Sequence, residues 1–155
     1  MTVNQVAKKA VQLGKGSLIA KIDIKSAYRL VPVSPVDCYY LGMQWNGKIY
    51  VDGMLPFGLR SAPKIFNAIA DAVEWYMARE GVQDIYHYLD DFAIIGPPSS
   101  EQCSWNLHIL QTVCKDLGIP LAAEKQAGPC STIEFLGIII DTIHQELRLL
   151  DDKLR

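Results

Sequence analysis

The sequence predicts a single α+β domain built on the split βαβ arrangement of ferredoxin-like folds. Apolar residues repeat every two positions in some segments and at helical spacing in others, which separates strands from helices. In the middle of the chain these segments follow the order strand, helix, strand, strand, helix, strand. A β-hairpin is added after the first strand, and further strands follow at the C-terminal end. The 155 residues, half of them hydrophobic, suit one domain with its own core.

The first segments are a helix and a strand. Residues 3–11 place apolar side chains at helical spacing, and Gly14 is expected to end that helix. Residues 18–24 alternate, which predicts a strand with one apolar face and a more polar face that carries Lys21 and Asp23.

A hairpin is marked by Asn46-Gly47, a dipeptide that favours a two-residue turn between antiparallel strands. Residues 39–45 and 49–54 flank this turn and are expected to pair with each other. The hairpin separates the first strand from the second helix.

The second helix is expected between a cap at Ser61 and a terminating Gly81, with Pro63 in its first turn. Strands are then expected at residues 84–88 and 92–96. The predicted buried face of the helix consists of Ile65, Phe66, Ile69, Val73 and Tyr76.

The remaining segments complete the predicted fold. Ser99 and Gln102 match a capping box, so a third helix is expected from there to Gly118. A turn is expected at Gly128-Pro129. Apolar segments predict two more strands, at residues 135–140 and 146–150.

Composition excludes several classes of function. The formal net charge of −2 lacks the basic excess of an independent nucleic-acid-binding protein, so other segments would have to hold a phosphate backbone. The four cysteines have neither Cys-x-x-Cys spacing nor a histidine cluster, which disfavours a zinc site. His87, His108 and His144 lack partner spacing for metal or acid–base work and are expected to be structural or surface residues.

The sequence shows no signal peptide and no apolar run of the ~20 residues that a membrane span needs. We therefore expect an intracellular protein that is not secreted and has no membrane partner. The chain opens directly into a helix and stops on a charged stretch, residues 153–155, so we expect a fragment of a longer polyprotein.

The most informative feature is Tyr88-Leu89-Asp90-Asp91, which lies between two predicted strands. Two adjacent carboxylates repel each other unless a proton or a cation lies between them, and Mg²⁺ prefers such ligands together with substrate phosphates. Asp23 ends the strand that neighbours this pair in a split βαβ sheet. Three converging carboxylates would hold two metal ions about 3.5–4 Å apart for in-line phosphoryl displacement. A surface turn and a solvated strand end explain the same residues without any function.

Five segments resemble the motifs of reverse transcriptases, in that family's order, and cover about residues 18–140. The surrounding sequence is most similar to DIRS-like retroelements, which carry a tyrosine recombinase. Residues 21–28 resemble motif A, residues 55–63 with Ile65-Phe66 motif B, residues 88–91 the Tyr-x-Asp-Asp of motif C, residues 117–125 motif D, and residues 135–137 the primer grip, motif E.

The resemblance implies that Asp23, Asp90 and Asp91 ligate two Mg²⁺ ions, which Mn²⁺ could replace, and that the Ile24 carbonyl is a further ligand. It also implies that Lys125 is a general acid for the leaving pyrophosphate. An isolated lysine is otherwise a solvated surface charge.

A dNTP is the implied substrate. Tyr28 is implied to be a steric gate whose ring clashes with a 2′-hydroxyl, although an ordinary half-buried aromatic ring is the alternative. Phe57 and Gly58 are implied to form the nucleotide pocket, where Gly58 lets the backbone approach closely. The backbone amides implied to face the triphosphate are those of Lys25, Ser26 and Ala27.

The residues implied to contact the primer–template are Tyr88, Pro63, Phe135, Leu136 and Gly137. Pro63 also suits the first turn of a helix, and Phe135 and Leu136 also suit a core strand, so these residues have a structural explanation as well.

The resemblance therefore implies a polymerase palm domain, within a retrotransposon polyprotein, that is part of an RNA-directed DNA polymerase. Residues 1–155 would form this single domain, with most of the fingers, the whole thumb and an RNase H segment encoded elsewhere. Its partners would be an RNA or DNA template with a primer, and dNTPs. Two alternatives stay open: an RNA-templated RNA polymerase, against which Tyr28 and Tyr88 argue, and an inactive or domesticated palm that binds nucleic acid or protein.

Overall fold

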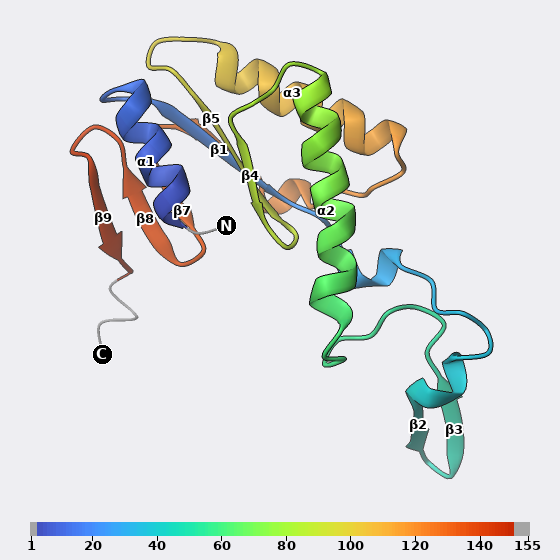
Figure 1. Ribbon diagram of the computed structural model, residues 1–155. Coiled ribbons are helices and arrows are strands. Elements are labelled where there is room, and N and C mark those ends of the chain that lie inside the picture. Colours follow the sequence, from blue (N-terminus) through green and yellow to red (C-terminus); the bar gives the residue numbers. More distant parts are fainter. Residues whose placement is uncertain (1–2, 151–155) are drawn as a thin grey trace.

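The computed structural model describes residues 3–150 and has the predicted α+β architecture. Its centre is a four-stranded antiparallel sheet with the strand order β4-β5-β1-β6 (Figure 1). Helix α2 (Ala62–Arg79) precedes β4, and α3 (Gln102–Asp116) connects β5 to β6, which confirms the split βαβ topology. The four strands are β1 (Leu18–Asp23), β4 (Ile85–Tyr88), β5 (Asp91–Gly96) and β6 (Ala127–Cys130).

Both faces of the central sheet are covered. Helices α2 and α3 pack on one face, and α1 (Val3–Leu13) with the C-terminal sheet covers the other (Figure 1). The C-terminal sheet consists of β7 (Thr132–Phe135), β8 (Ile138–Asp141) and β9 (Glu146–Leu149). The α2 side buries Ile22, Phe66, Phe92, Ile94 and Leu110, and the α1 side buries Val6, Ile19, Ala93, Ile95 and Phe135.

The more polar face of β1, which carries Lys21 and Asp23 as expected, does not face solvent. Ile19 is fully buried on that face, and Asp23 is only 7% exposed. Alternation in β1 therefore separates two apolar clusters rather than core from solvent.

The predicted buried face of α2 is also only partly right. Phe66 and Val73 are buried as expected, but Ile65 and Tyr76 are exposed. Small side chains take the intervening core positions and let the helix lie close to the sheet. The buried residues are Ala62, Phe66, Ala70, Val73 and Met77.

The start of α3 differs from the predicted capping box. The Ser100 hydroxyl, not that of Ser99, accepts the Gln102 amide hydrogen, at 3.0 Å. Ser99 adopts a positive φ of 55° in the preceding turn, and the N-cap residue Glu101 makes no capping hydrogen bond with its side chain.

Two further expectations fail near the C-terminal end. Gly128-Pro129 is not a turn but lies within β6, at the edge of the central sheet. The strand expected at residues 135–140 is a hairpin, because Leu136 and Gly137 have φ values of 51° and 76° between β7 and β8. Leu136 still packs against the core, so the apolar pattern continues through the turn and hides it.

The added hairpin projects away from the rest of the molecule (Figure 1). Strands β2 (Gly42–Trp45) and β3 (Lys48–Val51) pair across Asn46 and Gly47, both with positive φ, as the sequence predicts. Cys38–Leu41 forms a short 3-10 helix instead of the expected start of a strand. Within residues 3–150, no helix has the length and hydropathy to cross a membrane.

Gly96 allows β5 to end directly against α3. A methyl group at this position would lie 2.7 Å from the Cys103 amide nitrogen. Gly96→Ala should therefore lower the free energy of unfolding by about 1–3 kcal/mol, the usual cost of overpacking. Urea denaturation measures this, with Gly53→Ala as the control because no atom lies within 4 Å of its added methyl group. Unchanged stability of Gly96→Ala would contradict the close packing.

Candidate active site

The pairing of β1 with β5 brings two acidic residues together. Asp23 lies directly opposite Asp91 at the end of this antiparallel ladder. Cross-strand partners point to the same face, with Cβ atoms typically about 4.5–5.5 Å apart. The sheet thus joins two carboxylates that are remote in the sequence.

Asp90 lies in the tight turn that connects β4 to β5. The pair formed by Tyr88 and Asp91 closes this turn. Leu89 takes the positive φ of 55°, an unfavourable conformation for a residue with a side chain. The Asp90 carbonyl accepts the Ile24 amide hydrogen at 2.9 Å, so the turn is fastened to the chain just after β1.

The carboxylates perturb one another. Burial raises the pKa of Asp90 and of Asp91 above the ordinary value, and the charge of Asp23 raises both further. The charge of Asp90 also raises the pKa of Asp91. Partly buried like charges of this kind are relieved by a bound cation.

Lys125 is the basic side chain in direct contact with this group. Its Nζ atom lies 2.5 Å from an Asp23 carboxylate oxygen, and this hydrogen bond raises the pKa of Lys125. The Lys125 side chain is 62% exposed, so it sits at the rim of the cluster. Its segment is held against β1 by the Ala122 amide, which donates to the Asp23 carbonyl at 2.8 Å.

The residues implied to bind the nucleotide surround the end of β1. Lys25 and Ser26 are exposed, whereas Ala27 is buried at the start of the short 3-10 helix Ala27–Leu30. Ser26 has a φ of 55°, which turns the chain sharply after Ile24. Two exposed residues, Lys25 and Ser26, therefore lie just after the Asp23 end of β1.

Tyr28 joins this segment to the loop before α2. Its ring centroid lies 5.1 Å from that of Phe57 and 5.8 Å from that of Phe66. Burial, and then the charge of Asp90, raises the pKa of the Tyr28 hydroxyl, which places this ring beside the acidic turn. Phe57 is 72% exposed, and Gly58 has a φ of 84° with open space where a methyl group would lie.

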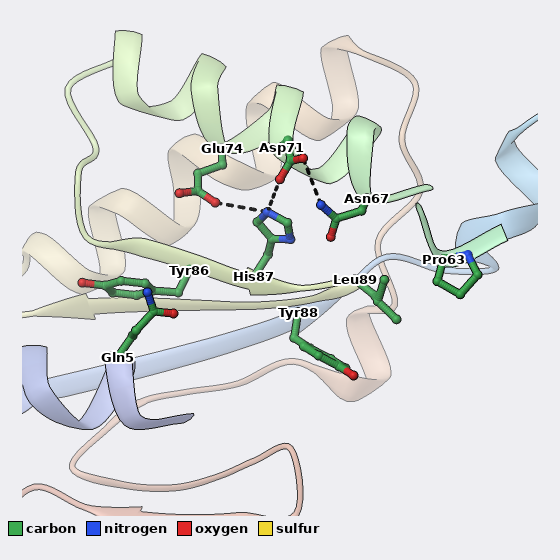
Figure 2. A pocket seen from close by; sticks show the side chains of 9 residues that line it. All are labelled: Gln5, Pro63, Asn67, Asp71, Glu74, Tyr86, His87, Tyr88 and Leu89. Carbon is green, nitrogen blue, oxygen red and sulfur yellow. Dashed lines mark hydrogen bonds and ion pairs between the residues drawn. The ribbon is translucent and has the colours of Figure 1, made fainter. Parts of the chain in front are cut away.

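The residues implied to contact the primer–template lie in two separate places. Tyr88 and Pro63 line one pocket along β4, together with Leu89 (Figure 2). Phe135 is buried in the core between the central sheet and the C-terminal sheet. Leu136 and Gly137 form the β7–β8 turn.

The partners of His87 could not be predicted from its sequence neighbours. This side chain is 7% exposed, and its Nε2 atom lies 3.1 Å from both an Asp71 oxygen and a Glu74 oxygen of α2 (Figure 2). The three residues line the pocket of about 430 Å³ that also contains Tyr88 and Pro63. The partners belong to another element, so spacing could not reveal them. The alternation that puts Ile85 and His87 on one face of β4 indicates only that His87 is buried.

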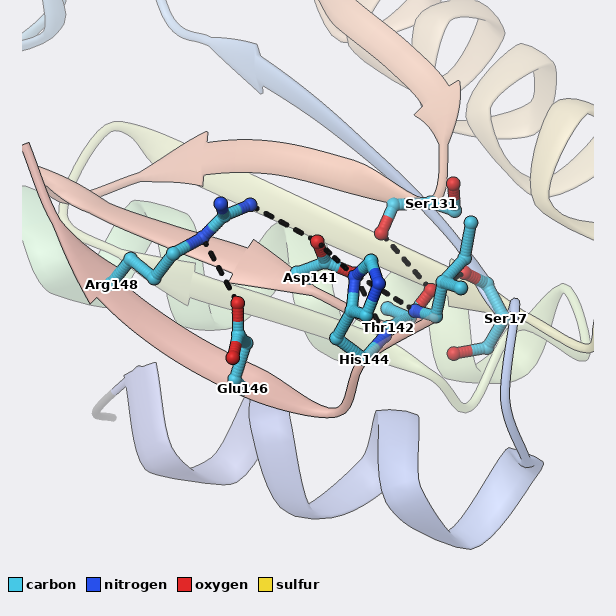
Figure 3. A network of polar contacts seen from close by, with 8 residues as sticks. Ser17, Ser131, Asp141, Thr142, His144, Glu146 and Arg148 are labelled. Atoms are coloured by element: carbon cyan, nitrogen blue, oxygen red, sulfur yellow. Dashed lines mark hydrogen bonds and ion pairs between the residues drawn. The ribbon is translucent and has the colours of Figure 1, made fainter.

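His144 also has partners that its spacing did not suggest. Asp141, His144 and Glu146 place ligand atoms within 4.8 Å of one another, as a metal site requires (Figure 3). However, Asp141 already accepts hydrogen bonds from two backbone amides, from His144 and from Arg148. These four bonds use its acceptor capacity, and Arg148 supplies the positive charge. This group therefore fastens the β8–β9 turn.

The group around Asp23 offers the oxygen-only ligands that a hard divalent cation prefers, although its three carboxylates do not all lie within 4.8 Å of one another in the described residues. Asp23, Asp90 and Asp91 provide carboxylate oxygens on one sheet edge, and burial with mutual repulsion raises the pKa of Asp90 and Asp91. Mg²⁺ and Mn²⁺ prefer such oxygen ligands. The chain thus has oxygen ligands of the kind these ions prefer, beside the exposed residues Lys25 and Ser26.

Comparisons with known proteins agree on one family. The profile for reverse transcriptase (RNA-dependent DNA polymerase) matches residues 1–140. The chain is 33% identical over 132 residues to the retrovirus-related Pol polyprotein from transposon gypsy of Drosophila melanogaster, covering 83% of this chain and 12% of that protein. It is 28% identical over 128 residues to the Pro-Pol polyprotein of Feline foamy virus, covering 83% of this chain and 11% of that protein. The chain therefore spans only a small part of these relatives.

Solved structures show the same fold. A foamy viral protease-reverse transcriptase in complex with RNA/DNA hybrid superposes with a TM-score of 0.70 at 22% identity, covering 90% of this chain and 18% of that one. A foamy viral protease-reverse transcriptase in complex with dsDNA gives a TM-score of 0.74 at 21% identity, covering 90% of this chain and 27% of that one.

The raised pKa of Asp91 predicts a gain in stability when its charge is removed. A carboxyl group whose pKa is higher in the folded state loses stability as the pH rises from 3.8, its ordinary pKa, through the raised value. Asp91→Asn should therefore stabilise the fold at pH 7 by on the order of 1 kcal/mol or less, because solvent screens the charges. The gain should disappear below pH 3.8.

Urea denaturation at several pH values measures this gain. Glu134→Gln, on the exposed face of β7, is the control and should change stability by less than about 0.5 kcal/mol at any pH. A loss of stability in Asp91→Asn at pH 7 would show that the Asp91 charge is compensated in the fold.

Proposed function

Because the chain belongs to the reverse transcriptase family, we propose that it is the palm of an RNA-directed DNA polymerase that catalyses two-metal nucleotidyl transfer. The observation that carries this proposal is the β1–β5 register, which sets Asp23 opposite Asp91 with Asp90 in the adjoining turn. A primer 3′-hydroxyl attacks the α-phosphate of a dNTP, and pyrophosphate leaves.

Asp23, Asp90 and Asp91 would hold the two Mg²⁺ ions, and the Ile24 carbonyl would be a further ligand; Mn²⁺ has the same ligand preferences. When bound, these ions make the attacking hydroxyl more acidic and neutralise the leaving group. The residues contribute position, because the ladder and the Ile24–Asp90 hydrogen bond fix the carboxylates before substrate arrives.

Lys125 serves as the general acid for pyrophosphate. Its contact with Asp23 keeps the ammonium group at the rim of the site, and its pKa is raised there, so it carries a proton at neutral pH. Its exposed side chain can swing from Asp23 toward a triphosphate bound beside the carboxylates.

Tyr28 discriminates between sugars. Its ring is held from below by Phe66 and lies against Phe57, so it cannot easily move away from a 2′-hydroxyl. Gly58 leaves open space for a base or sugar. The segment of Lys25, Ser26 and Ala27 would face the triphosphate, with the Lys25 amide already donating to the Pro120 carbonyl at 2.8 Å.

The template and primer lie along the pocket that Tyr88 and Pro63 line. The β7–β8 turn, with Leu136 and Gly137, holds the primer end. Phe135, just before this turn, supports it by packing in the core.

We further propose that residues 1–155 are one domain of an intracellular retroelement polyprotein of the DIRS-like group. Most of the fingers, the thumb and an RNase H segment would be supplied by other parts of that polyprotein. This fits the low net charge, because the basic grip on nucleic acid would lie in those segments.

Loss of one metal ligand should abolish polymerisation. Asp90→Asn in the complete enzyme should reduce primer extension by about 10³-fold or more, because the site loses a charge that stabilises the transition state. Circular dichroism should show an unchanged fold. Asp116→Asn, at the exposed end of α3, serves as a control with normal extension. Near-normal extension by Asp90→Asn would reject the mechanism, and metal binding without extension in the parent enzyme would favour a domesticated binding module.

Removal of the Tyr28 ring should relax sugar selection. Tyr28→Ala should raise the ratio of ribonucleotide to deoxyribonucleotide kcat/KM by about 10²-fold, since the steric clash is lost. Single-nucleotide insertion with each substrate measures the ratio, and Tyr76→Ala, an exposed tyrosine of α2, is the control. An unchanged ratio would refute the gate, and a parent enzyme that prefers ribonucleotides would indicate an RNA polymerase.

A further inference from the structure

Strand β4 carries the catalytic turn but has support on only one side. It is the edge strand of the central sheet and pairs with β5 alone. Polar contacts fasten both ends of this region to the helices. At the end far from the turn, Asp84 pairs with Lys9 of α1 at 2.6 Å. At the end next to the turn, His87 contacts Asp71 and Glu74 of α2.

In its contact with α2, His87 is the hydrogen-bond donor. Ionised carboxylates only accept hydrogen bonds, so Nε2 carries the hydrogen that Asp71 accepts at 3.1 Å. A Glu74 oxygen also lies 3.1 Å from Nε2, as an ion-pair contact. Asn67 donates to the other Asp71 oxygen at 2.9 Å and helps to orient it (Figure 2). The Nδ1 atom of His87 is buried and has no partner in the part of the chain that the structure describes.

His87 also lies directly behind the catalytic turn. Its ladder partner is Phe92, and the two rings stack with centroids 5.4 Å apart. The next pair in the ladder is Tyr88 with Asp91, which closes the turn. The stacked pair of His87 and Phe92 is therefore the ladder pair directly adjacent to the acidic turn.

Helix α2 links this layer to the nucleotide side of the site. Its Phe66 packs against Tyr28, while Asp71 and Glu74, further along the same helix, hold His87. A helix is stiff over these two turns. The Tyr28 ring and the acidic turn are therefore both positioned by contacts with the same rigid helix.

We propose that His87 is a positioning residue that fixes the Asp90–Asp91 turn against α2 through its shared contact with Asp71 and Glu74. The proposal rests on the polymerase function proposed above. His87 touches neither substrate nor metal; it acts through the strand that carries the turn.

If His87 served only to fill the core, an apolar ring would suit its position better. A phenylalanine ring would stack on Phe92 equally well and would leave no buried nitrogen without a partner, so a histidine is a poor choice for packing alone. Only the hydrogen-bonded contact with α2 distinguishes the two rings. His87→Phe therefore separates positioning from packing.

The kinetic test uses the complete enzyme. His87→Phe should lower kcat by about 10- to 100-fold, the scale expected for a misplaced catalytic group, while the KM for dNTP stays within about threefold. His87→Gln, which keeps an N–H donor, should recover part of the loss. Asp71→Asn combined with Glu74→Gln should lower kcat as well, and adding these changes to His87→Phe should cause little further loss.

Lys9→Met is the matched control, because it breaks the polar contact of the same region at the far end of β4. It should leave kcat within about twofold of the parent, since strand pairing insulates the turn from that end. Equal losses in Lys9→Met and His87→Phe would overturn the proposal, as would a His87→Phe enzyme with parental kcat.

A second measurement does not depend on activity. Hydrogen–deuterium exchange of the peptide covering residues 88–96 should be at least several-fold faster in His87→Phe than in the parent 155-residue chain, and unchanged in Lys9→Met. Parental exchange in His87→Phe would overturn the proposal. If the parent enzyme failed to extend primers, the polymerase function would fail, and this exchange rate alone would decide the role of His87.

Discussion

The antiparallel pairing of β1 with β5 determines the position of every group in the proposed site. This register sets Asp23 opposite Asp91 and lets the turn carry Asp90 beside them. A shift of one residue would move an aspartate to the opposite face of the sheet, because side chains alternate. The register is held by two apolar clusters, since β1 and β5 bury side chains on both faces. The large core of this small domain thus keeps together three charges that repel one another.

The remaining features of the site compensate for, or use, this crowding. Lys125 places a positive charge on Asp23 at the rim, and Leu89 accepts an unfavourable backbone conformation so that the turn stays tight. Helix α2 then ties the nucleotide side to the acidic side, through Phe66 at one point and through the carboxylates that hold His87 at another. A metal-dependent polymerase needs such fixed geometry, because its residues contribute mainly position and charge to phosphoryl transfer.

Local patterns in the sequence were enough to predict the order of the elements and the placement of Asp23 next to Asp91. The Asn46-Gly47 turn, the alternation in β1 and the apolar run of β5 are local signals, and the split βαβ order then predicted which strands adjoin. The failures arose where tertiary contacts decide. Which face of α2 is buried depends on how closely the helix approaches the sheet, and the Leu136–Gly137 turn is hidden because Leu136 packs in the core. The partners of His87 lie on another element, beyond any local pattern.

The central claim is that Asp23, Asp90 and Asp91 jointly bind two metal ions for nucleotidyl transfer. Anomalous scattering from Mn²⁺ in crystals of the complete enzyme, with primer–template and an unreactive dNTP analogue, tests it most directly. Two manganese peaks about 3.5–4 Å apart, both ligated by these carboxylates and the nucleotide phosphates, are predicted. Manganese bound only near Asp141, or a nucleotide bound away from the β1–β5 edge, would contradict the account.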